Sequence, residues 1–151
     1  MANDKNGHKI VRDSVGRGRN RVCCVGITTE EGLIVSVLGG QHPHVGAVAL
    51  AIPRPSLRDA QKRSVSTSVL TLVGHKDDEL AKPISEKIAK KCNQVTVVVV
   101  GVHVENASED DIKRLIGNSM RAVDKLLTKF EKTCSNRLRK RAQKSKIMLR
   151  K

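Results

Sequence analysis

The sequence predicts a two-layer α+β fold, in which a mostly antiparallel five-stranded sheet carries two helices on one side in the order β-β-β-β-α-β-α. Four short runs rich in β-branched and small residues precede the first segment with helical periodicity. A fifth such run separates that segment from a second, longer one. Because 151 residues suffice for one hydrophobic core but not for two, a single folded domain is expected.

The first two strands are expected to form a hairpin. Residues 22–29 (VCCVGITT) and 33–40 (LIVSVLGG) flank the turn sequence Glu30–Glu31–Gly32. Both runs have the β-branched composition that is typical of strands. A turn that contains glycine between them favours antiparallel pairing of neighbouring strands.

The third and fourth strands follow a break that is rich in glycine and proline. The third is expected at His44–Ile52 and should end before Pro53–Arg54–Pro55–Ser56, since proline has no N–H for the ladder. The fourth, Ser64–Val73, alternates valine and threonine with serine and leucine. This period of two indicates a sheet with one better-buried face.

Two amphipathic helices complete the pattern. The first should begin near Asp78, where acidic residues suit the helix dipole, and has an apolar residue at about every fourth position. A strand at Val95–Val104 separates it from the second helix, which Asn106–Ala107–Ser108 should cap. The apolar stripe of the second helix ends at Phe130.

The net charge of +14 is concentrated at the two ends of the chain. Residues 1–21 carry six basic and two acidic groups, residues 22–131 fourteen and thirteen, and residues 132–151 nine and none. We therefore expect a flexible basic arm, a folded domain and a basic tail or helix extension, with these boundaries. The tail is suited to nonspecific nucleic-acid contact, whereas Phe130, as the only aromatic residue, provides no platform for stacking bases.

Two kinds of segment are missing from the sequence: long apolar runs and closely spaced cysteine pairs of the CxxC type. It has no apolar run of the roughly 18 residues that cross a membrane and no apolar segment near its start, so a cytoplasmic protein is expected. Its four cysteines have no CxxC spacing. We interpret them as reduced thiols rather than zinc ligands or disulfides.

Candidate binding residues gather in three segments: Gly39–Ala47, Pro53–Ser56 and Gly74–Lys76. Glycines allow backbone N–H groups to approach an anion, and imidazole, Arg or Lys side chains could bind a phosphate. Spacing alone makes a hairpin turn about equally good an interpretation of Gly39–Gly40. His42 and His44 without a nearby carboxylate or Cys form a weak metal site, and no metal is expected.

Catalytic signatures are missing from the sequence. It contains no GxSxG, Walker A or GxGxxG unit in a suitable context. A small hydrolase that uses His44 or His75 is left as an alternative, but it has no evident set of nucleophile, base and orienting residue. No catalytic residues are therefore assigned.

The strings GGQHPHVGAVALAIPRPSL and STSVLTLVGHKDDELAKPISEKIAKKCNQVTVVVVGVHVENASEDDI resemble the prenylated-flavin chaperone-like family, which includes accessory proteins of gallate-decarboxylase-type enzymes. The resemblance runs from about Val22 to Phe130. It implies a fold like that of the proteasome assembly chaperones and a non-catalytic, self-associating protein that binds prenylated FMN, or another FMN-type cofactor, and assists its delivery to a partner decarboxylase. A cofactor-free assembly chaperone or interaction module is the alternative.

The resemblance also implies the positions of the cofactor-binding residues, because they occupy the motif segments of the family. These residues are Gly39, Gly40, Pro43, His44, Gly46, Arg54, Pro55, Ser56, Gly74, His75 and Lys76.

Overall fold

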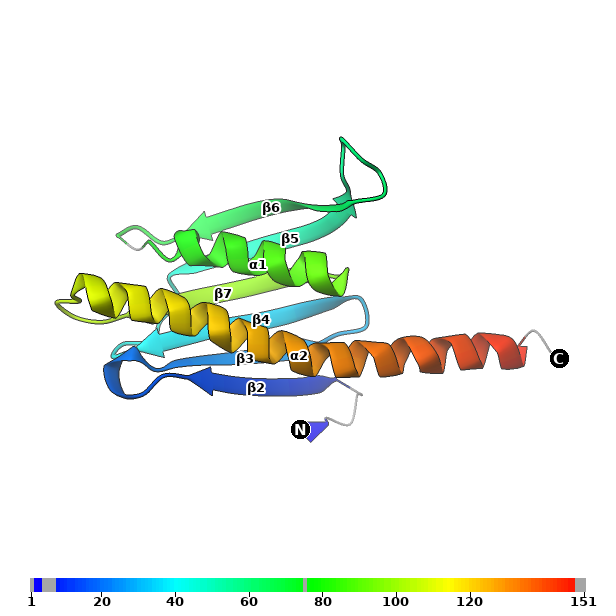
Figure 1. The fold of residues 1–151 in the computed structure, drawn as a ribbon, viewed down its shortest axis with the longest axis horizontal. Helices are drawn as coiled ribbons and strands as arrows, with labels where there is room; N and C mark the ends of the chain where they lie inside the picture. The colour runs from blue at the N-terminus through cyan, green and yellow to red at the C-terminus, as the bar shows by residue number, and fades with distance from the viewer. Residues whose placement is uncertain (1, 4–7, 75, 149–151) are drawn as a thin grey trace.

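The computed structural model describes the backbone of residues 2–3, 8–74 and 76–148 and the side chains of residues 8–74 and 76–130. One sheet and two α-helices make up the fold (Figure 1). The elements are β1 (Ala2–Asn3), β2 (Lys9–Val15), a 3₁₀ turn η1 (Gly18–Asn20), β3 (Val22–Thr28), β4 (Gly32–Gly40), β5 (Ala47–Pro55), β6 (Arg63–Thr71), α1 (Asp78–Cys92), β7 (Val95–His103) and α2 (Glu109–Met148).

The sheet has the order β1-β2-β3-β4-β7-β5-β6. Strands β4 and β7 are parallel, and every other neighbouring pair is antiparallel. The prediction of a mostly antiparallel sheet is therefore confirmed. Strand β7 lies between β4 and β5, and this interior position agrees with its valine-rich sequence.

The prediction of five strands is wrong, because the sheet has six strands of seven to nine residues in addition to the two-residue β1. The additional long strand is β2, which lies in the segment that the sequence assigns to a flexible arm. Among its charged residues, buried and exposed positions alternate only weakly. Val11 is 2% exposed and packs under α2. All seven residues of β2 pair with β3, and this pairing stabilises the strand. The local sequence of β2 does not indicate that β3 is available as its partner.

Strand β5 begins at Ala47 and runs through Pro53 to Pro55, three residues later at both ends than predicted. Its pairing with β7 ends at Ala51, so from Ile52 onward only β6 is its register partner. Proline is tolerated in a strand where one edge has no neighbour. Residues 41–46 consequently form a loop rather than the start of a strand.

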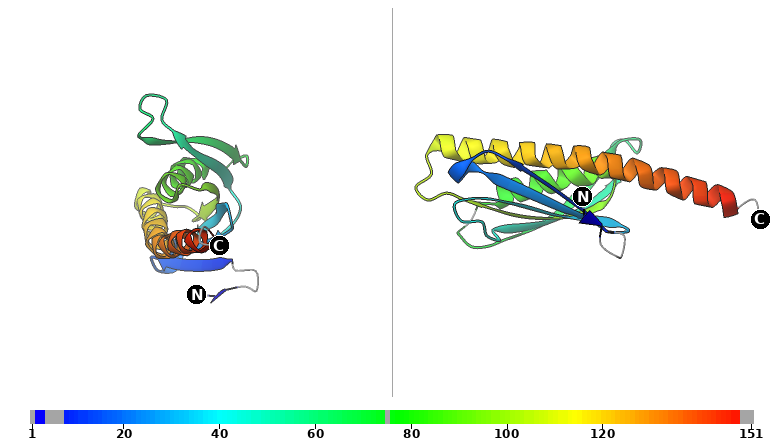
Figure 2. Two further views of the ribbon diagram at one scale, coloured as in Figure 1. Left: turned by 90° about the vertical axis from the view of Figure 1, so that its right-hand side faces the viewer. Right: turned by 90° about the horizontal axis from the view of Figure 1, so that it is seen from below.

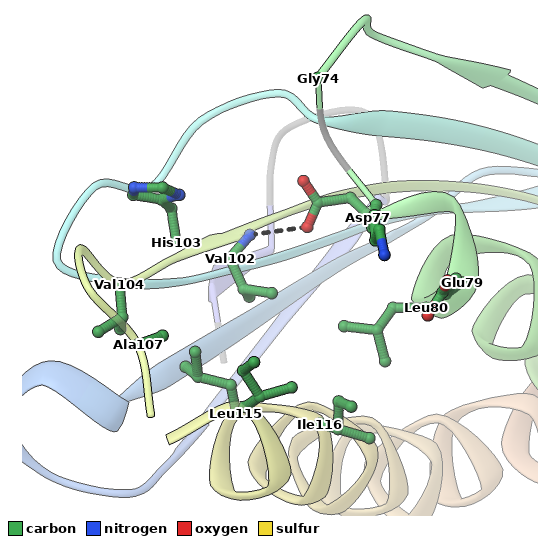
Figure 3. A pocket seen from close by; sticks show the side chains of 12 residues that line it. Gly74, Asp77, Glu79, Leu80, Val102, His103, Val104, Ala107, Leu115 and Ile116 are labelled. Atoms are coloured by element: carbon green, nitrogen blue, oxygen red, sulfur yellow. Dashed lines mark hydrogen bonds between the residues drawn. The ribbon is translucent and has the colours of Figure 1, made fainter. Parts of the chain in front are cut away.

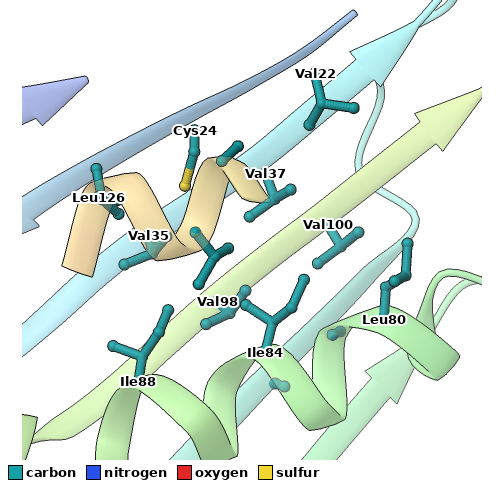
Figure 4. Close-up of a cluster of buried hydrophobic side chains, with 14 of the residues drawn as sticks. Val22, Cys24, Val35, Val37, Leu80, Ile84, Ile88, Val98, Val100 and Leu126 are labelled. Atoms are coloured by element: carbon teal, nitrogen blue, oxygen red, sulfur yellow. The ribbon is translucent and has the colours of Figure 1, made fainter. Parts of the chain in front are cut away.

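Both helices cover the same face of the sheet, as predicted (Figure 2). Helix α1 packs on β5, β6 and β7, and α2 packs on β2, β3 and β4. Side chains that alternate along the strands meet the helices in one hydrophobic core, which includes Val35 and Val37 of β4, Val98 and Val100 of β7, and Ile84 and Ile88 of α1 (Figure 4).

Helix α2 is 40 residues long and projects well past the sheet (Figure 1). Its backbone continues as a helix through most of the segment that the sequence assigns to a basic tail or helix extension. Among the described residues, no helix is both long and apolar enough to span a membrane.

Asp111 fastens the turn η1 to the start of α2. Its carboxylate accepts hydrogen bonds from Asn20 Nδ2 at 3.0 Å and Ser108 Oγ at 2.8 Å, and pairs with Arg19 at 3.2 Å. The bonds from Asn20 and then Ser108 lower the pKa of Asp111 to about 2. A carboxyl group with a lowered pKa stabilises the fold above its unfolded pKa, and that contribution is lost as the pH falls toward 2.

We expect Asp111→Asn to reduce stability at pH 6 and to lose this effect in acid. Urea unfolding of both proteins at pH 6, 4 and 3 measures the difference, which should shrink between pH 4 and 3, because this carboxyl group becomes protonated in the unfolded chain while in the folded wild type, with a pKa of about 2, it stays ionised. Asp110→Asn is the matched control for removing one negative charge. A constant difference across this range would show that these hydrogen bonds do not stabilise the fold.

Candidate functional site

A cavity of about 350 Å³ lies between the N-terminal ends of α1 and α2, beside the end of β7 (Figure 3). Apolar side chains form most of its walls, and the polar residues come chiefly from the segment before α1 and from His103. Its lining residues are Gly74, Lys76, Asp77, Glu79, Leu80, Val102, His103, Val104, Ala107, Ile112, Leu115 and Ile116.

Asp77 sets the position of α1 against β7. It precedes the helix and is 6% exposed. Its Oδ1 atom accepts a hydrogen bond from the backbone N–H of Val102 at 3.1 Å (Figure 3). Along β7, Val100 is the last residue that pairs with β5. The N–H of Val102 lies beyond this paired region, and Asp77 supplies its acceptor. The start of α1 is thereby held at the edge of the cavity.

His44 pairs with the same carboxylate from the loop before β5. Its Nε2 atom lies 3.2 Å from Asp77 Oδ2, and its Nδ1 atom lies 3.0 Å from the carbonyl oxygen of His42. The carboxylate and the carbonyl oxygen are both hydrogen-bond acceptors, so a ring nitrogen that carries a proton can donate to the neighbour that it faces. The loop of residues 41–46 is therefore tied to α1 through a largely buried polar contact.

Three imidazole rings gather beside this contact. The ring centroid of His103 lies 6.0 Å from that of His42 and 6.1 Å from that of His44. His42 Nε2 is also 3.5 Å from a carboxylate oxygen of Glu105. Within residues 8–74 and 76–130, no three His, Cys, Asp or Glu side chains are arranged to hold a metal ion.

The motif glycines bring chain segments together. A Cβ atom at Gly46 would overlap the Asp77 carboxylate, and one at Gly40, where φ is +85°, would overlap the carbonyl oxygen of His103. A Cβ at Gly39 would lie 2.5 Å from the carbonyl oxygen of Arg21. These positions exclude a side chain because protein atoms occupy the space. The three glycines allow neighbouring chain segments to approach closely, and they do not line the cavity.

Gly74 differs from these three glycines. Its φ is +84°, and a Cβ there would meet no heavy atom within 4 Å. It lines the cavity together with Lys76, which is exposed. The structure therefore brings two predicted site residues, Gly74 and Lys76, to the cavity. His75 lies outside the described residues.

Arg54, Pro55 and Ser56 lie at the opposite end of β5. Arg54 lies eight positions after Gly46 along the extended strand, a span of about 26 Å. Arg54 donates hydrogen bonds to Ser66 Oγ at 2.9 Å and to the Pro55 carbonyl oxygen at 3.0 Å. Arg54 and Pro55 line a separate cavity of about 250 Å³. The predicted site residues thus fall into two groups that the fold does not bring together.

Sequence reasoning missed the apolar part of the cavity. Leu115 and Ile116 belong to the apolar stripe of the second helix, and both line the cavity, where Ile116 is 43% exposed. The apolar stripe of α2 is wider than packing on the sheet requires, and this excess width could have indicated the two cavity residues. The bonding of Asp77 to Val102 has no local sequence signal, because 25 residues separate them.

Comparisons with known proteins agree with this architecture. The model of the "Prenylated flavin chaperone LpdD-like domain" family matches residues 16–131. A chain from the crystal structure of a chaperone complex for yeast 20S proteasome assembly is similar in fold, with a TM-score of 0.51 and 14% sequence identity over 83% of this chain and 96% of that chain. No curated protein matches significantly in sequence.

Proposed function

Because the chain belongs to the prenylated flavin chaperone LpdD-like domain family, we propose that it is a non-catalytic chaperone that binds prenylated FMN and delivers it to a partner decarboxylase. The family match supports a chaperone or accessory role. The cofactor, the decarboxylase client and a cytoplasmic location are parts of the proposal.

The cavity between α1 and α2 is the observation that carries this proposal. Its apolar walls suit a flat ring system with a prenyl-derived ring, and a lysine at its mouth suits a phosphate. Glu79 also borders the cavity, and its negative charge would repel a phosphate. We therefore place the phosphate on the side of Gly74 and Lys76. The carboxylate of Asp77 is directed to His44 and Val102.

The predicted site residues take different parts in this proposal. Gly74, His75 and Lys76 would contact the cofactor. Residues of the 39–46 segment would act indirectly, by fixing the loop and Asp77. Arg54, Pro55 and Ser56 would lie outside the cofactor site. When bound, the cofactor would supply flavin chemistry to the client enzyme, while the residues of this chain bind the ring and shield it from water.

Titration with prenylated FMN, followed by absorbance and fluorescence, tests the position of the site. Lys76→Gln should weaken binding about tenfold through loss of a charge-assisted bond, and Ile116→Trp should weaken it by filling the cavity. Arg54→Gln is the matched control and should bind like the wild type. The opposite pattern would move the site to the far end of β5, and absence of binding by the folded wild type would favour the cofactor-free interaction module.

Reconstitution of a client tests delivery. An apo-decarboxylase with limiting prenylated FMN should reach a higher active fraction when the wild-type chain is present, and Ile116→Trp should reduce this gain. The chain alone should show no turnover. Equal client activity with the wild type, with the variant and without the chain would contradict the delivery function even if the cofactor binds.

A further inference from the structure

Strand β6 forms one edge of the sheet and is paired on one side only (Figure 1). Among the described residues, its strand partner is β5, over nine consecutive positions from Pro55↔Arg63 to Ala47↔Thr71. The outer side of β6 therefore carries backbone N–H and C=O groups that no neighbouring strand of the described chain uses.

The register identifies the residues whose backbone groups face outward. The N–H of Leu72 donates to the carbonyl oxygen of Gly46 at 2.9 Å, one position beyond the paired strands. Hydrogen-bonded and non-hydrogen-bonded pairs alternate in an antiparallel ladder, so β5 bonds to the even-numbered residues of 64–70. Both prolines of β5, which have no N–H, lie opposite odd-numbered residues, as this assignment requires. The N–H and C=O groups of the odd-numbered residues of 65–71 therefore point away from the sheet.

This edge lacks the features that normally prevent a further strand from pairing. Proteins protect exposed edges with charges, prolines, bulges or short strands. Residues 64–71 read SVSTSVLT, which contains no charge and no proline, and their register with β5 has no interruption. At the other side of the sheet, by contrast, β2 contains Lys9, Arg12 and Asp13 and pairs in part with β1. Strand β6 is thus open to one more strand.

A cavity lies beside this edge on the helix side of the sheet. It has a volume of about 330 Å³ and is lined by Ser64, Val65, Pro83, Glu86, Lys87 and Lys90, from β6 and α1. Thr67 Oγ1 donates to Glu86 Oε1 at 3.0 Å, so the odd-numbered side chains of β6 face α1. A strand added to β6 would place every second side chain on this same side, next to the cavity.

Basic side chains surround the cavity near the start of β6. Lys87 and Lys90 line it, and Arg63 Nη1 donates to the Lys90 carbonyl oxygen at 2.8 Å, which holds a third cation close by. The carboxylate of Glu86 already accepts a hydrogen bond from β6, and Lys87 pairs with Asp124. Lys90 and Arg63 are exposed. This arrangement favours a ligand with a carboxylate beside Lys90 and Arg63.

We propose that an extended segment of a partner protein adds to the free edge of β6 as a further strand, with an acidic residue beside Lys90. Antiparallel pairing is the more stable, and it would place this acidic residue toward the C-terminal end of the segment, next to the start of β6. Backbone hydrogen bonds would supply the affinity, and the cavity would select the side chains.

The charge of the edge argues for a different protein rather than a second copy of β6. Residues 63–74 contain no Asp or Glu, so pairing of two copies along this edge would leave Arg63 and Lys90 without a carboxylate from the added strand. The cavity beside β6 also shares no lining residue with the candidate cofactor site. A bound segment therefore leaves that site open, and the test does not depend on the cofactor.

Selection from a phage-displayed library of random decapeptides, with the full chain as target, provides the test. Selected peptides should be rich in β-branched residues and carry Asp or Glu toward the C-terminal end. In fluorescence anisotropy, a synthetic copy of a selected peptide should bind Lys90→Glu about tenfold more weakly than the wild type. Lys82→Glu is the matched control, since Lys82 is also exposed on α1 but does not line the cavity, and it should bind like the wild type.

Hydrogen exchange measured by NMR on the wild type locates the bound peptide without any variant. Saturating peptide should slow exchange about tenfold at the odd-numbered residues of 65–71 and change it little at the even-numbered residues, which already bond to β5. Val65→Pro removes one outward N–H, leaves the bonds to β5 in place and should weaken binding about fivefold.

Three results would overturn the proposal. The first is a library that yields no binder, and the second is protection that falls outside β6 or equally on both sets of residues. The third is equal binding by Lys90→Glu and Lys82→Glu. A fall in the mass of the peptide-free chain on Val65→Pro, measured by sedimentation equilibrium, would also overturn it, because the edge would then belong to a second copy.

Discussion

Phe130→Ala is expected to lower the free energy of unfolding by about 3–5 kcal/mol, the usual cost of removing a fully buried phenylalanine ring. Phe130 is 0% exposed and lies on α2. Its ring fills the space above Gly26 of β3, where a Cβ would overlap the ring edge and come within 3.1 Å of Leu126. Neither neighbour can refill the volume, since one has no side chain and the other is already buried.

Urea denaturation of the wild type and the variant measures the change in the free energy of unfolding, and thermal unfolding measures the melting temperature. The melting temperature should fall by about 10 °C, given roughly 2–4 °C per kcal/mol for a chain of this length. Phe130→Leu, which retains most of the volume, is the control and should cost less than half as much. A loss below 1 kcal/mol for Phe130→Ala would mean that α2 does not pack on β3 as described.

Gly46→Ala is the second substitution with a large expected effect. The added methyl group would overlap the Asp77 carboxylate, which is buried, paired with His44 and bonded to Val102 N–H. Displacing it would break its contact with His44 Nε2 and leave a strand N–H without its acceptor, so a loss of about 2–4 kcal/mol is expected.

A matched glycine makes this test specific. Gly117→Ala introduces the same methyl group into α2, where no heavy atom lies within 4 Å, and should raise stability by about 0.5–1 kcal/mol through helix propensity. Thermal unfolding of both variants should therefore shift in opposite directions. Equal, small shifts would show that the loop of residues 41–46 moves away from Asp77 at little cost.

Local pattern predicted those parts of the fold that depend on neighbours in sequence. The β3–β4 hairpin, the alternation in β6 and the start of α1 all follow from periods and turn residues within about ten positions. Strand β2 escaped prediction because its apolar residues are few and its partner supplies the pairing.

The candidate site was harder to predict than the fold. Its glycines could be interpreted equally well as an anion cradle or as a turn, and in the structure Gly40 and Gly46 leave room for His103 and Asp77. Spacing identifies where glycine is required but does not show whether a ligand or another part of the chain occupies the vacant space. The grouping of Lys76 with Ile116 arises from packing α1 beside α2, which no short segment encodes.

The parallel pairing of β4 with β7 has a consequence for the order of folding. The register joins Gly32 to Val95, 63 residues later in the chain. During synthesis, the free edge of β4 in the β3–β4 hairpin therefore stays unpaired until all of β7 has left the ribosome. Contacts of such large sequence separation slow folding, because a long loop must close before they form. The nascent chain thus presents an apolar strand edge for longer than a simple meander would.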